Sequence, residues 1–388
     1  MRTRKDIEEL EEKILAPYAM KSRDSAGRYY QEPDHESRTC YQRDRDRIVH
    51  CEAFRKLEYK TQVFVIFEGD YYRTRLTHTL EVSQISRTIG RNLRLNEDLI
   101  EAIALAHDLG HPPFGHAGEA ALNQIMRQAN LRGFNHNERS YEIVTQYEKR
   151  YPHFPGLNLT KEVLVGILKH KSPYDSPGKV REFLDEFPTL EAQVVDMADS
   201  LAYLNHDIDD GLTSGCIEES DLVESELWQK AIKHLEAPLK DQTPEIRKYQ
   251  IVKELIDMQV KDLLCNSNLR LTKQNFRSSK DVKRSQKETI GFSAKMEKER
   301  NFLQELINKK LYHHFRVERM TNKAKRIIEA LFRVYHTGPT QLPPEVYQEG
   351  KRYNQRQLYA LICNHIASMT DRFALDEHKK LFNPYEKV

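Results

Sequence analysis

The sequence predicts an all-α protein with minor β-structure. Along most of its strongly periodic stretches, apolar residues recur at spacings of three and four, the pattern of helices with one buried face. β-Favouring residues gather in one good run, 61–67, which predicts a short hairpin arm. No apolar run approaches the roughly 20 residues that a membrane-spanning helix needs, so we expect no membrane partner.

Each expected helix follows from its own apolar stripe. Asn96 or Glu97 begins the third of these helices, and Thr160 is the expected N-cap of the sixth, because side-chain oxygens of Asn and Thr accept hydrogen bonds from free N–H groups of a first turn. The expected helices are 7–15, 76–93, 97–107, 118–126, 138–149, 161–169, 190–208, 302–311, 322–335 and 354–368. The pair Pro343-Pro344 marks a clear break before the last of them.

Composition and charge narrow the class of protein. The 388 residues include 39% hydrophobic ones, enough for a sizeable core. Lys and Arg total 61 against 59 for Asp and Glu, so the net charge of +2 gives no global attraction to nucleic acid or anionic membrane. Five scattered cysteines without a Cys-x-x-Cys pair argue against a thiolate zinc site and favour a reducing compartment. With no apolar N-terminal segment, we expect a cytoplasmic protein.

We expect one catalytic body rather than independent modules. Residues 1–60 are predicted to form an N-terminal helical arm, 61–265 the catalytic core, and 266–388 a helical extension that forms one structural unit with the core. The boundary follows a change of composition after Cys265, where 270–300 becomes polar and rich in Lys and Arg. That stretch is either a solvated loop or helix face, or a surface that contacts a polyanion or another subunit.

One short stretch carries most of the chemistry. Residues 105–119 read Leu-Ala-His-Asp-Leu-Gly-His-Pro-Pro-Phe-Gly-His-Ala-Gly-Glu, and Gly110 with the prolines after it ends the preceding helix. Ionisable groups are rarely buried without a partner, so core packing does not explain this composition. A bound metal together with an acid/base pair explains it. The candidate residues are His107, Asp108, His111, His116 and Glu119.

Further metal ligands must come from other helices, because adjacent side chains on a helix point about 100° apart. His78 and Asp199 are polar residues on otherwise apolar helices. Taken alone, each is more often a core residue than a ligand. Together with His107 and Asp108 they form a set of two imidazoles and two carboxylates, which suits Mg²⁺, Mn²⁺, Fe or another divalent ion better than a structural zinc.

The order His78, His107-Asp108, Asp199 resembles the H…HD…D signature of the HD superfamily of metal-dependent phosphohydrolases. Longer strings are similar to those of deoxynucleoside triphosphate triphosphohydrolases, the dGTPase-like family, in order and over nearly the whole chain. They cover 44–48, 60–64, 73–78, 106–119, 133–137, 156–160, 190–196, 206–211 and 369–374. The resemblance implies an HD-domain helical core, with its motif region at about 71–215.

The resemblance also implies a reaction. A deoxynucleoside triphosphate (dNTP) and water give deoxynucleoside and tripolyphosphate, with attack at the α-phosphorus and a divalent metal of the Mg²⁺, Mn²⁺ or Fe/Ni/Co type. Members of this family assemble as rings, often hexamers, so we expect a homo-oligomer. The resemblance leaves open which dNTP is preferred, and whether a second dNTP or single-stranded DNA acts as an allosteric partner.

The resemblance assigns the acid/base pair to His116 and Glu119, because the departing 5′-oxygen needs a proton. Their spacing brings them together if a helix starts after Phe114. His111 and His136 match positions that contact the α-phosphate region of the substrate. The alternative for these two is hydrogen-bonded loop histidines.

Sugar and phosphate contacts follow in the same way. Asp199, Tyr203 and Asp207 recur every four residues and share one helix face. The resemblance places Tyr203 against the C2′ edge of the sugar, where it would exclude a 2′-hydroxyl, although a core tyrosine is the alternative. The remaining assignments are Asp207 with Gln62 at the 3′-hydroxyl, Arg75 at the triphosphate, and Lys169, Lys171 and Arg316 as weaker triphosphate contacts. For these last three, a solvated surface position is the alternative. Ser200 stands where triphosphate-binding members can carry a lysine, which puts the γ-phosphate contacts in doubt.

Two other functions remain open at this point. One is another HD-type nucleotide phosphohydrolase, disfavoured because Leu109-Gly110-His111 follows the HD pair here. The other is a nucleotide-sensing or single-stranded DNA-binding regulatory protein, which the basic stretch would suit. The intact pair of His116 and Glu119 argues against a purely binding role.

Overall fold

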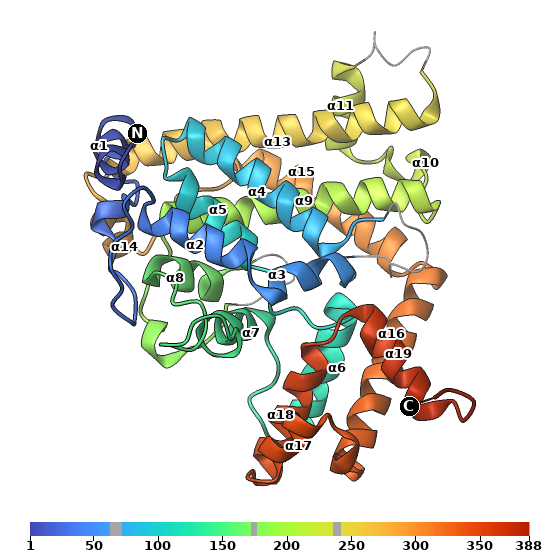
Figure 1. Ribbon diagram of the computed structural model, residues 1–388. Coiled ribbons are helices and arrows are strands. Elements are labelled where there is room, and N and C mark those ends of the chain that lie inside the picture. The colour runs from blue at the N-terminus through green and yellow to red at the C-terminus, as the bar shows by residue number, and fades with distance from the viewer. Residues whose placement is uncertain (63–71, 172–176, 236–241, 388) are drawn as a thin grey trace.

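The computed structural model describes residues 1–62, 72–171, 177–235 and 242–387, and these residues form a helical body (Figure 1). The α-helices are α1 (Arg4–Ile14), α2 (Cys40–Val49), α3 (Glu52–Lys56), α4 (Arg75–Asn92), α5 (Glu97–Ala106), α6 (Gly115–Gln128), α7 (His136–Glu142), α8 (Lys161–Lys169), α9 (Leu190–Ser214), α10 (Glu219–Leu222), α11 (Glu226–His234), α13 (Pro244–Gln274), α14 (Ser279–Ser285), α15 (Ala294–Ile307), α16 (Phe315–Thr337), α17 (Pro344–Gly350), α18 (Gln355–Ala367) and α19 (Asp371–Phe382). Short 3₁₀ turns are η1 (Ser22–Asp24), η2 (Leu57–Tyr59), η5 (Arg181–Phe183) and η7 (Pro339–Gln341), and π-helical turns are η4 (Ile143–Tyr147) and η6 (Asn308–Tyr312).

The prediction of an all-α fold is confirmed. Within the described residues, β-pairing outside the helices consists of two isolated bridges, Thr61 with Thr74 and Lys149 with Gly156. Most of the run expected to form a hairpin lies outside the described residues. Over the same part of the chain, no helix is both long and apolar enough to cross a membrane.

One expected helix is shorter in the structure for a local reason, and of two expected N-caps one caps its helix. The helix expected over 138–149 ends as α7 at Glu142 and passes into the π-turn η4; the next residue, Glu148, turns away so that its carboxylate accepts a hydrogen bond from the Ala53 N–H (2.9 Å). Asn96 caps α5 through the N–H groups of the first turn, as predicted. Thr160 stands at the N-cap position of α8, but its hydroxyl donates to Asp44 (2.6 Å) and caps nothing.

The longest helix, α13, was missed. Its buried face is a narrow stripe that mixes Leu255 and Leu263 with polar Gln259 and Ser267, so the apolar periodicity is weak. Thr243 as N-cap and Pro244 in the first turn are its recognisable start signals. α13 continues through residue 265, so the composition change there marks exposed turns of one helix and not the end of an element.

The main core lies where α4 and α5 pack against each other and both pack against α9, while α13 packs on α9 and also contacts α4 (Figure 1). Within α5, the residues from Leu99 onward are buried except Glu101. Residues 1–60, expected as an arm, contribute Tyr41 and Ile48 to this core, because α2 packs on α5. The packing of α4, α5 and α9 brings the residues of the HD pattern to one place.

A second apolar core joins the C-terminal helices to α6. It is built from α6, α16, α18 and α19, which lie together at the bottom of Figure 1. Leu122 of α6 and Ile328 of α16 are fully buried there. The extension therefore packs directly on the helix that carries His116. The division into arm, core and extension stays a prediction.

Asp371 links the extension to the motif turn. This first residue of α19 is fully buried, and its carboxylate accepts hydrogen bonds from the N–H of Phe114 (2.8 Å) and from the N–H (3.0 Å) and hydroxyl of Thr61. Phe114 immediately precedes α6, and Thr61 precedes Gln62. One carboxylate from the C-terminal extension thus holds two segments of the candidate site.

We expect Asp371→Ala to lower the free energy of unfolding by about 3 kcal/mol, because two buried N–H groups lose their acceptor. Urea denaturation measures this change. The control is Asp376→Ala on the same helix, whose exposed ion pair with Arg372 should be worth less than about 0.5 kcal/mol. Equal stabilities of the two variants would contradict the role given to Asp371.

Candidate metal centre

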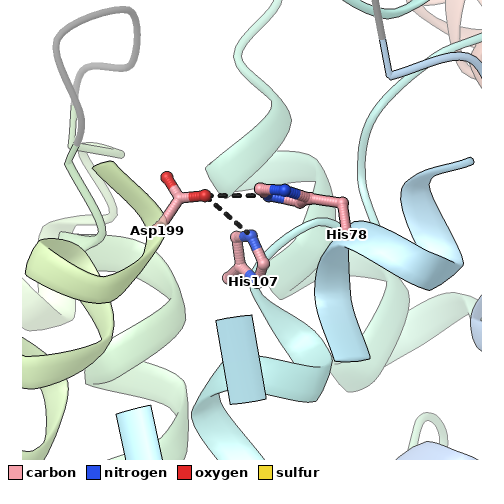
Figure 2. Close-up of side chains that lie close together, drawn as sticks. All are labelled: His78, His107 and Asp199. Atoms are coloured by element: carbon pink, nitrogen blue, oxygen red, sulfur yellow. Dashed lines mark hydrogen bonds and ion pairs between the residues drawn. The ribbon is translucent and has the colours of Figure 1, made fainter. Parts of the chain in front are cut away.

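Three side chains from three helices meet in the main core (Figure 2). His78 lies in α4, His107 follows the last turn of α5, and Asp199 lies in α9. The Oδ1 atom of Asp199 is 2.9 Å from His78 Nε2 and 3.7 Å from His107 Nε2. All three side chains are almost completely buried. This proximity is what the sequence pattern required; the role of each residue as a ligand stays a prediction.

One ring nitrogen of His107 has a geometry that suits a metal ligand. The Nδ1 of His107 donates to the carbonyl oxygen of Ala104 (2.6 Å), so Nε2 carries the lone pair. Nε2 is buried and, within the described residues, has no hydrogen-bond partner. Burial lowers the pKa of His107, which keeps the ring neutral. A buried, unpartnered imidazole nitrogen facing a carboxylate fits a divalent metal ligand.

Asp108 lies beside these groups but also has other partners. Its carboxylate oxygens are 3.5 Å from His107 Nε2 and 4.0 Å from His78 Nε2. The same carboxylate accepts a hydrogen bond from Arg75 (2.9 Å) and pairs with His111 Nδ1 (2.9 Å). Burial raises the pKa of Asp108, but the neighbouring His107 imidazole and the positive charge of Arg75 outweigh it and hold that pKa well below its usual range. Asp108 is therefore an ionised carboxylate that lies beside the group of His78, His107 and Asp199.

Close backbone packing explains the glycine after the HD pair. A Cβ on Gly110 would lie 2.1 Å from the carbonyl oxygen of His136, so no larger residue fits. The Ser140 hydroxyl accepts from the Gly110 N–H (2.8 Å) and donates to the His107 carbonyl (3.0 Å). Buried Lys60 also donates to the carbonyl of His111. Contacts from two distant segments of the chain thus fix the turn.

His116 and Glu119 sit in the first turns of α6. The helix begins at Gly115, three residues earlier than expected, and places His116 Nδ1 3.8 Å from Glu119 Oε2. Glu119 also accepts from the N–H (2.9 Å) and Nδ1 (3.1 Å) of His136. Glu119 is therefore shared between two histidines, which the sequence did not indicate. His116 is 34% exposed, whereas most of Glu119 is buried.

His111 and His136 form a stacked pair behind His116. Their ring centroids are 3.8 Å apart, and both rings are buried. Burial, helped by the charge of Arg75, lowers the pKa of His111 to about 3, so the ring is neutral. Burial raises the pKa of Glu119, but His136 and His116 outweigh it and keep the carboxylate ionised. The contact of these histidines with phosphate stays a prediction.

Tyr203 lies near both the metal-ligand candidate His78 and the acid/base candidate His116. Its ring centroid is 6.5 Å from that of His78 and 6.2 Å from that of His116. Its hydroxyl is hydrogen-bonded to the hydroxyl of Tyr312 (2.6 Å), which in turn donates to Asp207 Oδ2 (2.9 Å). Tyr312 comes from η6 in the extension, and no local sequence pattern marked it.

Asp207 is a buried acid, and within the described residues only its Oδ2 atom is hydrogen-bonded. Burial raises its pKa well above the usual range, against the effect of the Tyr312 hydroxyl. Its Oδ1 is buried and makes no hydrogen bond in the part of the chain that the structure describes, and the same holds for Oε1 of Gln62. Such atoms are costly unless something binds them.

The predicted cations divide into two groups. Arg75 is buried beside Asp108, as described. The side chains of Lys169 and Arg316 instead donate to backbone carbonyls, of Leu184 (3.0 Å) and Ser214 (3.3 Å). Lys171 is paired with Glu288. These three therefore lie against other surfaces, and the structure does not bring them to the histidine cluster.

Arg300, which the sequence analysis did not assign to the site, contacts Ser200, the residue after Asp199. Buried Arg300, from α15, donates to the hydroxyl (2.9 Å) and carbonyl of Ser200 and stacks over the ring of Phe292. Arg300 ends the polar stretch 270–300, so at least this member of the stretch is neither a solvated side chain nor a free surface charge.

Asp199 has outer partners that also escaped notice. His170 lies with Nδ1 2.7 Å from Asp196 Oδ1 and Nε2 3.3 Å from Asp199 Oδ2. Burial raises the pKa of Asp199, but hydrogen bonds from His170 and His78 hold it well below its usual range. Asp196 and Asp199 are one helical turn apart, which is the signal that could have linked them.

Comparisons with known proteins give a consistent result. The HD domain family matches residues 75–204, and a phosphohydrolase-associated domain matches 290–380. The chain is 49% identical over 376 residues to a deoxyguanosinetriphosphate triphosphohydrolase-like protein of Geobacter metallireducens, covering 96% of both chains. It is 48% identical to the protein of the same description from Geobacter sulfurreducens, over 98% of each chain, and 47% identical to that of Ralstonia nicotianae, over 95% of this chain and 94% of the other.

Proposed function

We propose that this chain, which belongs to the family of deoxyguanosinetriphosphate triphosphohydrolase-like proteins with an HD domain, hydrolyses dNTPs to deoxynucleoside and tripolyphosphate with a divalent metal ion. The observation that carries the proposal is the meeting of His78, His107 and Asp199, with Asp108 beside them, in a buried cluster. Tyr203, whose ring lies near the rings of both His78 and His116, supports a nucleotide as the substrate.

The metal would be held by His78, His107, Asp108 and Asp199. When bound, a divalent ion supplies charge neutralisation at phosphate and lowers the pKa of water. Mg²⁺, Mn²⁺ and ions of the Fe/Ni/Co type all suit this mixed donor set. Buried Arg75 adds a fixed positive charge beside Asp108, suited to a phosphate oxygen.

His116 would donate the proton that the leaving 5′-oxygen requires. It is the most exposed of the clustered histidines, so it can reach a substrate, and Glu119 can orient its ring. Hydrolysis at the α-phosphorus breaks the bond to the sugar oxygen and leaves the three phosphates joined. His111 and His136 would line the α-phosphate, with their rings fixed by stacking.

Tyr203 and Asp207 would read the sugar. The Tyr203 ring would occupy the space of a 2′-hydroxyl, and the spare oxygens of Asp207 and Gln62 would bond the 3′-hydroxyl. We expect Tyr203→Ala to raise kcat/KM for ribonucleotides relative to dNTPs by about tenfold or more. The substitution removes the steric cost of placing a 2′-hydroxyl against the ring, which is roughly 1–3 kcal/mol.

Competing dNTP and NTP turnover measures this ratio. Tyr203→Phe is the matched control, because it keeps the ring and loses only the hydroxyl bonded to Tyr312. The control should retain discrimination. If Tyr203→Ala discriminates as well as the parent, the tyrosine does not select the sugar.

Cytoplasmic location and assembly as a homo-oligomer, such as a hexamer, are also part of the proposal, as is a three-part division at about residues 60 and 265. Lys169 and Arg316 could approach a triphosphate only by leaving their present backbone partners. The assigned roles of Gln62, Arg75, His136 and Asp207 are proposed on their burial and position.

The test is product analysis with each dNTP, alone and in mixtures, in Mg²⁺ and in Mn²⁺. Anion-exchange chromatography separates tripolyphosphate from pyrophosphate and phosphate. We expect deoxynucleoside and tripolyphosphate in equal amounts. Deoxynucleoside monophosphate would instead indicate another HD-type phosphohydrolase. Nucleotide or single-stranded DNA binding without turnover under all conditions would indicate a regulatory protein.

A further inference from the structure

A row of polar side chains leads from His78 away from the cluster. His78 Nδ1 is 3.1 Å from Nδ1 of His206, and the two rings are nearly perpendicular at 84°. The other nitrogen of His206 is paired with the carboxylate of Glu81. Glu81 in turn accepts from Arg73 Nε (3.2 Å).

Two members of this row, Arg73 and His206, had no role in the assignments above, although each opens a string that holds assigned residues. Arg73 opens the string 73–78, and His206 opens the string 206–211. Arg73 is also held by Asp209 and Asp210, each 2.8 Å away. The row is therefore anchored to α9 at its far end. His206 is buried, whereas the side chain of Glu81 is 41% exposed.

Hydrogen-bonding rules set the direction of the row from its Glu81 end. An ionised carboxylate only accepts hydrogen bonds, so His206 Nε2 donates to Glu81. The Nδ1 of neutral His206 then carries a lone pair and accepts from Nδ1–H of His78. This row favours the tautomer of His78 that has its lone pair on Nε2, the form that binds a metal. Nε2 lies 2.9 Å from Asp199 Oδ1, a contact that favours the opposite tautomer while no cation is bound.

The backbone fixes the corresponding tautomer of His107, with the lone pair on Nε2. The Nδ1–H of His107 is taken up by the backbone carbonyl of Ala104. Both imidazoles of the cluster thus present Nε2, one fixed by the backbone and the other by a side chain. His78 sits in the interior of α4, where the helix's own hydrogen bonds occupy the carbonyl groups, so a side-chain acceptor is needed.

We propose that His206, oriented by Glu81, is a positioning residue that fixes the tautomer and ring orientation of His78 for metal binding. The inference rests on the proposed function, because it requires a metal at this cluster. Outer-shell partners of this kind typically change metal affinity by about 10- to 100-fold.

The test is the affinity of the full-length protein for Mn²⁺, measured by titration calorimetry without nucleotide. We expect His206→Ala to weaken binding by about 10- to 100-fold. His206→Gln should bind within a few-fold of the parent, because its amide can donate to Glu81 while its carbonyl oxygen accepts from His78. The control is His365→Ala, which removes a histidine that contacts Tyr335 in the second core, and should not change the affinity.

Two further measurements separate positioning from general damage. Glu81→Ala alters a half-exposed side chain that the fold should tolerate, and it should also weaken Mn²⁺ binding. The visible spectrum of the Co²⁺-loaded protein reports ligand geometry directly and should change in His206→Ala but not in His206→Gln.

The outcomes distinguish the two proposals. If the parent binds no Mn²⁺ at this cluster, both the proposed function and this inference fail. If the parent binds and His206→Ala binds equally well with an unchanged Co²⁺ spectrum, only the inference fails. A glutamine variant as weak as the alanine variant would also contradict it.

Discussion

Asp199→Asn is expected to lower dNTP turnover by at least about a thousandfold, the equivalent of roughly 4 kcal/mol of lost transition-state stabilisation. The substitution keeps the size of the side chain but removes the negative charge that His78, His107 and His170 all approach. A neutral amide is a poor partner for a divalent cation, so Mn²⁺ affinity should fall together with turnover. Steady-state kinetics and calorimetry measure the two losses.

The matched control is Asp44→Asn. Asp44 is also a fully buried aspartate, but it pairs with Arg28 and Thr160 in the N-terminal part of the chain. It should lose stability without losing Mn²⁺ affinity. If Asp199→Asn turns over dNTPs like the parent, Asp199 does not hold a catalytic metal.

His116→Ala is expected to lower kcat by about 10²- to 10⁴-fold while Mn²⁺ affinity stays unchanged. This pattern distinguishes a proton donor from a metal ligand. His116 is separate from the ligand cluster: its close contacts include His111, Glu119 and Tyr203. The loss should be much smaller with a substrate that releases p-nitrophenolate, because that leaving group needs no proton.

His313→Ala serves as its control, because His313 is an exposed histidine 3.3 Å from Glu318 and resembles His116 only in having a glutamate partner. It should have parental kcat. Unchanged kcat in His116→Ala, or a parallel loss of Mn²⁺ affinity, would remove His116 from the role of acid.

The fold was predictable where a helix has a broad apolar face. The apolar residues of α5, α8 and α9 are easy to recognise in the sequence because each of these helices is buried over most of its surface. α13 and α19 bury only narrow faces; α19, with Asp371 and Ala374 buried, reads as a charged tail. Tertiary packing, not local periodicity, stabilises such helices.

The site was predictable where one segment carries several ligand-type residues. The stretch from His107 to Glu119 is of this kind. His78 and Asp199 were recognisable as polar residues on otherwise apolar helices, a pattern that the family resemblance then matched. Residues that act from distant segments left no local signal. Tyr312, His206, His170 and Arg300 became visible only through their contacts. Lys169 and Arg316 were named for their charge, which does not determine where a long side chain points.

We propose that one divalent cation is held between α4, α5 and α9. Anomalous diffraction from crystals soaked in Mn²⁺, collected at the manganese absorption edge, locates such an ion without reference to activity. We expect a single strong peak at coordination distance from His78 Nε2, His107 Nε2 and the carboxylate of Asp199. A peak confined to the cluster of His111, His116 and Glu119, or no peak in the protein, would contradict it.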